Sequence, residues 1–459
     1  MKGPKVVVLG AGSYFFGKPV IYNMVTSPVL REGVLALVDP DPDVLETMTA
    51  LAKRAAAEAK APLRIESSAD RRKVLAGADF VVLSFSFRNT WYRGLDTRIA
   101  AKYGVKMCSS DTIGPGGIFR ALRELPEVLR IASDVRELCP QAWLINFVNP
   151  TSTLGIGLKR YAPDVKSFAL CDGNHMPYVR AKYLQWLGLL DEKTLVPPPE
   201  MDAKFELVIT GVNHCTWILR CAYDGKDCLP RLREYVARQA RAEFETRPTE
   251  KSKPRLGFNY ALRLFDLYGY FPTAYTHTKE YVPFFQGWGV TPVDPEPITC
   301  FDAYTRREEM DEAWAATKRL ADGTTPISEF FASGRGDHAT DIIESMWGDL
   351  GKDFYINTTN GGAVTNLPPE AVLELRCKLD LKNGPKPYPV GPMPLGLRGL
   401  SMQVIDTHEL TAQAAVTCDR KILMRALATD PIVNNLGDAK NIMEELLEAE
   451  REHLDPRWY

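Results

Sequence analysis

The chain of 459 residues has little of what several protein classes require. Its nine cysteines are odd in number and follow no disulfide-framework spacing, and only six histidines occur. No stretch approaches the roughly 20 apolar residues that span a bilayer. No charged, apolar leader precedes the first apolar run at residue 6. We therefore expect a cytoplasmic protein with reduced thiols and no membrane partner.

The charge is also nearly balanced, with 56 Lys and Arg against 58 Asp and Glu. A net charge of −2 gives no electrostatic reason to expect a nucleic-acid partner. Apolar residues make up 45% and charged residues 25%, which is ordinary for a soluble globular protein. The length exceeds what a single simple core organises, so two associated lobes are expected.

In the first 175 residues, short apolar runs alternate with helical patterns. The runs are almost continuously apolar, as expected for parallel strands covered on both faces. Strands are predicted at Val6–Leu9, Val34–Val38, Phe80–Leu83, Leu144–Phe147 and Ser167–Leu170, and helices at Val44–Ala61 and Ile118–Leu138. This alternation predicts an α/β fold with a Rossmann-like, doubly wound parallel sheet.

After about residue 175 the pattern becomes irregular, with proline-rich turns and aromatic-rich helices. We expect a nucleotide-binding domain over residues 1–175 and a second, mixed α+β lobe over residues 176–459, with a soft boundary. The second lobe is expected to carry the substrate, metal and oligomerisation contacts. The tail, Asn435–Leu454, predicts one amphipathic helix for packing or subunit contact.

A dinucleotide-binding motif opens the chain. The first apolar run leads directly into Gly10-Ala-Gly12-Ser13. Gly10 permits a tight turn, and Gly12 lets the backbone and the following helix amides approach a pyrophosphate. Asp39 ends the second predicted strand, where a carboxylate accepts the ribose hydroxyls of NAD and disfavours a 2′-phosphate. The third glycine of the usual motif is displaced to Gly17.

Two further residues suggest metal chemistry. Cys171 and His214 each end an apparent strand, and a thiolate and an imidazole can hold a divalent ion while leaving positions open for substrate oxygens. Taken separately, each has an ordinary alternative. A cysteine at a strand end is usually a small core residue, and a single histidine is usually structural.

The chain resembles glycoside hydrolase family 4, a group that depends on NAD and manganese and departs from the usual two-carboxylate mechanism. The resemblance is spread over nearly the whole length. It rests on Gly10–Ser13, Asp111–Arg123, Asn149–Pro150, Cys171–Asp172, Gly211–His214, Gly269–Pro272, His277, Glu280–Tyr281, Asn360–Gly362 and Leu367–Pro368. It implies a lactate/malate dehydrogenase-like architecture with Cys171 and His214 as metal ligands, and a homodimer or homotetramer.

The resemblance also implies a reaction sequence on a small-molecule glycoside. NAD takes hydride from sugar C3, the metal stabilises the charge that follows, and a base removes the C2 proton. The leaving group departs from C1 with help from an acid, water adds, and the hydride returns. Asp172 is expected to be the acid and favours an α-linked substrate; its alternative is a turn cap. Tyr260 is expected to be the base, with Tyr268 and Tyr270 as alternatives.

Other motif residues are expected to contact substrate. Asp111 and Asn149 are predicted to meet sugar hydroxyls, and Asn149 also lies where the cofactor is expected. Arg120 or Arg123 is expected to face an anionic substrate group. His175 lies in an insertion that precedes Met-Pro and is absent from the phospho-α-glucosidase pattern, so it is a substrate contact, a metal ligand or a turn residue. Whether the sugar is neutral, phosphorylated or a uronide stays open.

Two other functions compete with this one. An NAD-dependent 2-hydroxy-acid dehydrogenase of the lactate/malate type shares the nucleotide-binding architecture, but it leaves the Cys171 motif without a role. A non-catalytic NAD-sensing protein leaves the metal, acid and base candidates without a role.

Overall fold

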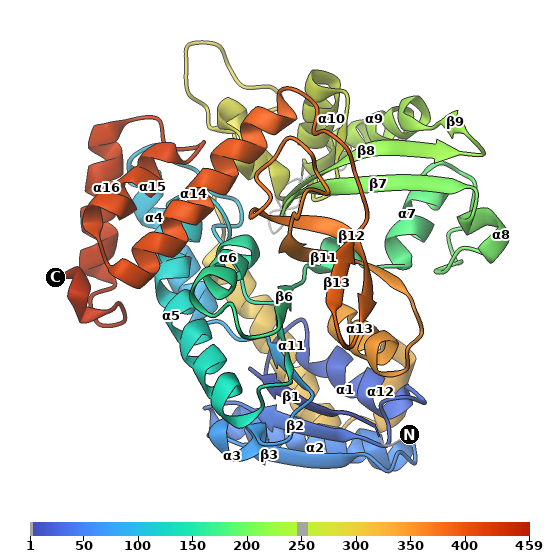
Figure 1. The fold of residues 1–459 in the computed structure, drawn as a ribbon. Helices are drawn as coiled ribbons and strands as arrows, with labels where there is room; N and C mark the ends of the chain where they lie inside the picture. Colours follow the sequence, from blue (N-terminus) through green and yellow to red (C-terminus); the bar gives the residue numbers. More distant parts are fainter. Residues whose placement is uncertain (1–2, 246–255) are drawn as a thin grey trace.

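One mixed sheet of 13 strands runs through the computed structural model, which describes residues 3–245 and 256–459 (Figure 1). Six strands form its parallel part: β1 (Lys5–Leu9), β2 (Val34–Val38), β3 (Arg64–Ser68), β4 (Phe80–Leu83), β5 (Trp143–Asn146) and β6 (Ser167–Ala169). They are ordered β3-β2-β1-β4-β5-β6, the order of a dinucleotide-binding Rossmann sheet. The predicted fold class is therefore confirmed.

The remaining strands extend this sheet in antiparallel fashion. They are β7 (Phe205–Val212), β8 (Cys215–Tyr223), β9 (Lys226–Asp227), β10 (Phe271–Pro272), β11 (Asp353–Thr359), β12 (Val372–Asp380) and β13 (Gly384–Pro387). Strands β11 and β12 lie between β6 and β7, through the pairs Asn357–Ala169 and Glu374–Gly211. The sheet thus continues across the predicted boundary at residue 175, and the two-lobe division stays a prediction.

Helices cover both faces of the sheet. In chain order they are α1 (Gly17–Thr26), α2 (Pro42–Glu58), α3 (Arg72–Leu75), α4 (Asn89–Lys102), α5 (Gly114–Leu138), α6 (Thr151–Tyr161), α7 (Tyr178–Trp186), α8 (Pro199–Asp202), α9 (Leu229–Glu245), α10 (Gly257–Tyr268), α11 (Ala303–Asp322), α12 (Ile327–Ser333), α13 (His338–Trp347), α14 (Leu397–Thr417), α15 (Arg420–Thr429) and α16 (Leu436–Ala449). Short 3-10 turns are η1 (Asp172–Asn174), η2 (Thr278–Tyr281), η3 (Pro283–Phe285) and η4 (Pro456–Trp458). In the described residues, none of these helices is long and apolar enough to cross a membrane.

The alternation of side chains along each buried strand builds two cores. On β1, Val6 and Val8 face one core and Val7 and Leu9 face the other. The first core is closed by α1 and α2, and the second by α4 and α5. Both faces of the parallel strands other than the edge strand β3 are therefore buried, which explains why these strands are almost entirely apolar in the sequence.

The local differences from the prediction have simple causes. Strand β3 was not predicted, because it is an edge strand whose side chains are polar and half-exposed. Helix α2 begins two residues earlier than predicted, because the Asp41 carboxylate caps it by accepting from the N–H groups of Asp43 and Val44. At the tail, Asn435 caps α16, which ends at Ala449, well before the predicted end.

The displaced glycine of the nucleotide motif has a packing role. A Cβ at Gly17 would overlap the carbonyl oxygen of Ala11 and lie 3.0 Å from Cε of Met48. Helix α1 thus begins in close contact with the nucleotide turn. This is the close packing that the third glycine of the motif normally permits, reached here at a longer spacing.

We expect Gly17→Ala to lower the free energy of unfolding by about 1–3 kcal/mol, because an added methyl group must displace backbone. Gly399→Ala is the control, since a Cβ at this exposed position in α14 meets no atom within 4 Å. It should be neutral or stabilise by about 0.5 kcal/mol through helix propensity. Denaturant titration compares the two variants, and equal stabilities would contradict a tight contact at Gly17.

Candidate active site

The nucleotide turn lies at the carboxyl ends of β1 and β2. Gly10 has a φ of 91°, and a Cβ there would lie 2.8 Å from Cα of Phe85. The N–H of Gly12 donates to Oδ2 of Asp39 at 3.1 Å, and burial raises the pKa of Asp39 although this bond opposes the shift. Gly12 and Ser13 line a cavity of about 580 Å³, within the range of ligand pockets. The predicted cofactor residues around this turn are therefore close together.

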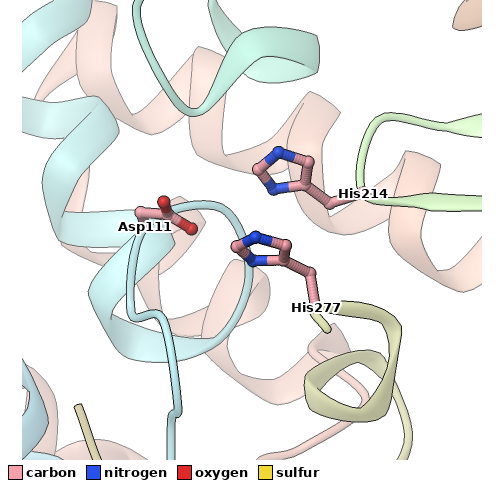
Figure 2. Close-up of side chains that lie close together, drawn as sticks. All are labelled: Asp111, His214 and His277. Carbon is pink, nitrogen blue, oxygen red and sulfur yellow. The ribbon is translucent and has the colours of Figure 1, made fainter. Parts of the chain in front are cut away.

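Three side chains from separate segments converge beyond this turn, as Figure 2 shows. Asp111 lies in the loop before α5, His214 in the hairpin between β7 and β8, and His277 just before η2. One ligand atom of each lies within 4.8 Å of the other two. The imidazoles are stacked with their ring centroids 4.4 Å apart. One carboxylate and two imidazoles around a common point form a donor set suited to a divalent ion.

Hydrogen bonding orients this group. The hydroxyl of Thr112 donates to Oδ1 of Asp111 at 2.9 Å and lies 3.0 Å from Nδ1 of His214. Since that hydroxyl already donates to the carboxylate, it accepts from Nδ1 of His214, which leaves Nε2 with a free lone pair. In the part of the chain that the structure describes, buried Nδ1 of His277 has no hydrogen-bond partner. Both imidazoles thus have a nitrogen available for an ion.

The electrostatics keep this group ready for a cation. Burial favours protonation of Asp111, but neighbouring cations, Arg93 first and Arg120 among them, lower its pKa overall. Burial, reinforced by His277, lowers the pKa of His214 to about 3, and burial also lowers the pKa of His277. At neutral pH the carboxylate is therefore ionised and both imidazoles are neutral, the forms in which these groups ligate metals.

Three buried side chains hold the loop that carries Asp111. The carboxylate of Glu280 accepts from the N–H groups of Ser109 and Ser110, both at 2.8 Å. His408 Nε2 lies 3.2 Å from the carbonyl oxygen of Thr112, and Asp430 accepts from the N–H of Gly114 at 2.8 Å. The loop therefore has a defined position without belonging to a helix or a strand.

Arg120 connects this group to the nucleotide cavity. Its guanidinium donates to Ser86 Oγ at 3.1 Å and lies 4.0 Å from Oδ2 of Asp111, and Ser86 also lines the cavity. Asn149 donates to the same Asp111 oxygen at 3.4 Å. Of the two arginine candidates, only Arg120 adjoins the site, because Arg123 is enclosed by two buried carboxylates in ion pairs of 2.6 and 2.8 Å.

Cys171 lies near this group but outside it. Burial, reinforced by Glu374, raises the pKa of its thiol. The side chain of Glu374 accepts from Asn174 at 2.5 Å and from Asn213 at 3.3 Å. One buried carboxylate therefore ties the segment after Cys171 to the residue before His214.

Asp172 and His175 belong to a neighbouring polar cluster. His175 Nε2 lies 2.7 Å from a carboxylate oxygen of Asp341, and its ring stacks on that of His338 with centroids 4.6 Å apart. His338 Nδ1 lies 3.1 Å from the Cys171 carbonyl oxygen. Burial raises the pKa of Asp172, opposed by His175. The inserted histidine thus packs beside the predicted acid and is not in the group of three.

Tyr260 lies apart from these residues. Its side chain is 3% exposed, its hydroxyl donates to the carbonyl oxygen of Glu296 at 2.9 Å, and its ring packs edge-on against Phe285. Burial raises its pKa. The structure gives the predicted role as base no support, because the phenol is already engaged in the packing of α10. Of the alternatives, Tyr268 packs against Trp217, a core residue.

Comparison with known proteins places these features in a family. A model described as "Family 4 glycosyl hydrolase" matches residues 5–187, and one described as "Family 4 glycosyl hydrolase C-terminal domain" matches residues 209–433. The chain belongs to glycosyl hydrolase family 4. It is therefore an enzyme that hydrolyses glycosidic bonds, as the sequence resemblance indicated.

Relatives of this hydrolase differ in the substrates that they are named for. A probable 6-phospho-beta-glucosidase of Bacillus subtilis is 31% identical over 99% of this chain and 98% of its own length. An alpha-galactosidase of the same organism is 29% identical over 98% of this chain and 99% of its own length. Among solved structures, a 6-phospho-alpha-glucosidase from gut microorganisms, in complex with NAD and Mn²⁺, has a TM-score of 0.79 and 19% identity, covering 99% of each chain. A malate dehydrogenase of Cryptosporidium parvum has a TM-score of 0.50 at 13% identity, over 90% of this chain and 99% of its own.

Sequence reasoning missed two residues of the hydrolase's site. His277 and Glu280 are part of the segment that carried the family resemblance, yet neither was assigned a role. With only six histidines in the chain, a histidine three residues before a glutamate in a matched segment is a usable signal. Asp111 and His277 are 166 residues apart in the sequence, so only the folded chain shows that they meet.

The support of the Asp111 loop predicts a pH dependence of stability. Burial raises the pKa of Asp430 to about 7. Because the folded state then keeps a proton that the unfolded state has lost, this group's stabilisation falls as pH rises from about 4 to 7, by about 1.4 kcal/mol per pH unit. Asp430→Asn does not titrate, so its melting temperature should rise relative to that of the wild type between pH 5 and 7.

Asp380→Asn is the control for this prediction. A hydrogen bond from the backbone of Asn383 lowers the pKa of Asp380, which therefore stays ionised above pH 5 in both states. The difference in melting temperature between Asp380→Asn and the wild type should be constant over the same pH range. A constant difference for Asp430→Asn as well would contradict the protonation of Asp430.

Proposed function

We propose that this hydrolase cleaves an O-glycosidic bond with the help of NAD and a divalent metal ion. One observation carries the proposal. Arg120 links the cavity at the nucleotide turn to the group of Asp111, His214 and His277, because it donates to Ser86 of the cavity and lies 4.0 Å from Asp111. A redox cofactor and an ion would therefore meet at one place, which an ordinary two-carboxylate glycosidase does not need.

The two cofactors fit the residues that are present. When bound, NAD supplies reversible hydride transfer at sugar C3, so that no second redox substrate is needed. A divalent ion such as Mn²⁺ supplies charge stabilisation for oxygens on neighbouring sugar carbons. The likeness to the 6-phospho-alpha-glucosidase with NAD and Mn²⁺ supports both assignments.

We assign the ion to His214 together with Asp111 and His277. Because the imidazoles are neutral and the carboxylate is ionised, this group can bind an ion without releasing a proton. The family resemblance pairs His214 with Cys171 instead. His214 is common to both sets, and the segment that precedes it is tied to the Cys171 segment through Glu374. Metal binding by variants therefore distinguishes the two sets.

Asp172 is the proposed acid for the leaving group. Burial raises its pKa, as proton donation near neutral pH requires. Its position beside Cys171 and the cluster around His175 supports a role at the sugar's C1. An α-linked glycoside is accordingly the first substrate class to test. We do not assign the C2 base to Tyr260, whose hydroxyl is already bonded to Glu296.

Hydrolysis in deuterated water tests the proposal. The assay uses nitrophenyl α- and β-glycosides, including neutral sugars, uronides and 6-phosphates, with NAD, Mn²⁺ and reductant, while NADH absorbance is followed. We expect sugar release with deuterium at C2 and no net NADH. Release without deuterium would refute the elimination route, and net NADH on adding a 2-hydroxy acid would instead indicate a dehydrogenase. Light scattering on the same sample tests the homodimer or homotetramer, and a cytoplasmic location stays a prediction.

His277→Ala and Asp111→Asn should each weaken Mn²⁺ binding at least about tenfold, because each removes a donor, while NAD affinity stays unchanged. Isothermal titration with Mn²⁺ and with NAD measures both constants. Cys171→Ser is the matched comparison and should keep most of its Mn²⁺ affinity. The reverse result, with affinity lost only in Cys171→Ser, would move the ion to Cys171 and His214.

A further inference from the structure

Helix α11 lies over the nucleotide turn although it belongs to the second half of the chain. It packs against α2 and α4, and its position near the amino-terminal sheet can be followed in Figure 1. Residues from one helical face, spaced three, four and three apart, line the nucleotide cavity: Arg307, Met310, Trp314 and Thr317. Helix α11 therefore forms a wall of this cavity, opposite the turn itself.

Contacts at both ends fix this helix in place. Just before α11, the N–H of Phe301 donates to the carbonyl oxygen of Met107 at 2.8 Å, and Arg93 lies over the Phe301 ring at 4.0 Å. Near its carboxyl end, Arg54 of α2 donates to the carbonyl oxygen of Leu320. Helix α11 is thus attached at its amino end to the loop that leads to Asp111, and at its carboxyl end to α2.

The chemistry of the cavity suits the adenosine half of a dinucleotide. Val44 and Met48 of α2 line it together with Met310 and Trp314 of α11, and Trp91 of α4 adds to this apolar lining. Lys18 lies in the cavity near the glycine turn and supplies a cation for a pyrophosphate. A flat apolar ring joined to a diphosphate matches an apolar slot with a cationic end.

We propose that α11 completes the NAD site, with Trp314 and Met310 against the adenine ring. This rests on the proposed function and adds the residues that hold the cofactor's adenosine half. Between α2 and α11 the adenosine half of the cofactor contacts both halves of the chain. Because the reaction returns its hydride in every cycle, a tightly held cofactor does not slow turnover and need not exchange.

Calorimetric titration of the full-length enzyme with three probes tests the inference. Trp314→Ala and Met310→Ala should weaken NAD and ADP-ribose by about tenfold, in line with the effect of removing an aromatic partner from a base. Nicotinamide mononucleotide, which lacks the adenosine half, should bind all forms equally. Trp314→Phe keeps a flat apolar face and should restore most of the affinity. Glu312→Ala, exposed on another face of α11, is the control and should match the wild type.

Two results would overturn the inference. Wild-type affinity for NAD in both Trp314→Ala and Met310→Ala would show that α11 does not touch the cofactor. Equal weakening of ADP-ribose and nicotinamide mononucleotide would show a general structural effect instead of an adenine contact. If Trp314→Ala does not fold, Met310→Ala gives the same comparison, with Trp314→Phe as its conservative reference. Failure of the wild type to bind NAD at all would instead refute the proposed function, so the two failures are distinguishable.

Discussion

The position of one loop determines the arrangement of the whole site. Asp111 lies on the segment between α4 and α5, and the backbone of that segment is bonded to Glu280, His408 and Asp430. All three side chains are buried, and a buried polar group that loses its partner costs about 1–3 kcal/mol. Because these three come from distant elements of the second half, the site has its geometry only when that half is folded.

The charges around the loop explain how a buried carboxylate stays ionised. Three side chains approach the same carboxylate oxygen of Asp111. Its Oδ2 lies 3.8 Å from Arg93, 4.0 Å from Arg120 and 3.4 Å from Asn149. None of these contacts is a close ion pair. They stabilise the charge while leaving the carboxylate open to a stronger partner, since a divalent ion at short range outweighs cations nearly 4 Å away. The site thus keeps the Asp111 carboxylate ionised in the apo enzyme and leaves it open to an incoming ion.

Much of the fold was predictable from the sequence because buried parallel strands carry their own pattern. Five of the six parallel strands follow from short apolar runs, and the nucleotide turn and Asp39 follow directly after the first two. The carboxyl ends of such strands meet at one edge of the sheet. The edge strand β3 was missed because exposure removes the apolar pattern. The meeting of Asp111 with His277 was also beyond the sequence, since it depends on loops whose paths no periodicity describes.

The predicted pairing of Cys171 with His214 as metal ligands stays a prediction. Both residues follow strands of one sheet, and the family resemblance implies that they hold one ion. The structure separates those strands by β11 and β12, whose residues come nearly 140 positions after His214. No local pattern near either residue indicates that insertion. The role of Tyr260 as the base also stays a prediction, because a tyrosine on an amphipathic helix gives the same sequence pattern whether it faces a site or a core.

The place of β11 and β12 in the sheet also has a consequence for biosynthesis. Ribosomes add residues in order, so β6 and β7 emerge long before the strands that lie between them. Until residues 353–380 have emerged, the edges of β6 and β7 that will pair with β11 and β12 lack those partners. Exposed strand edges are templates for pairing with other chains. The nascent enzyme therefore has an incomplete sheet until these residues are made, and its site assembles only after they have emerged.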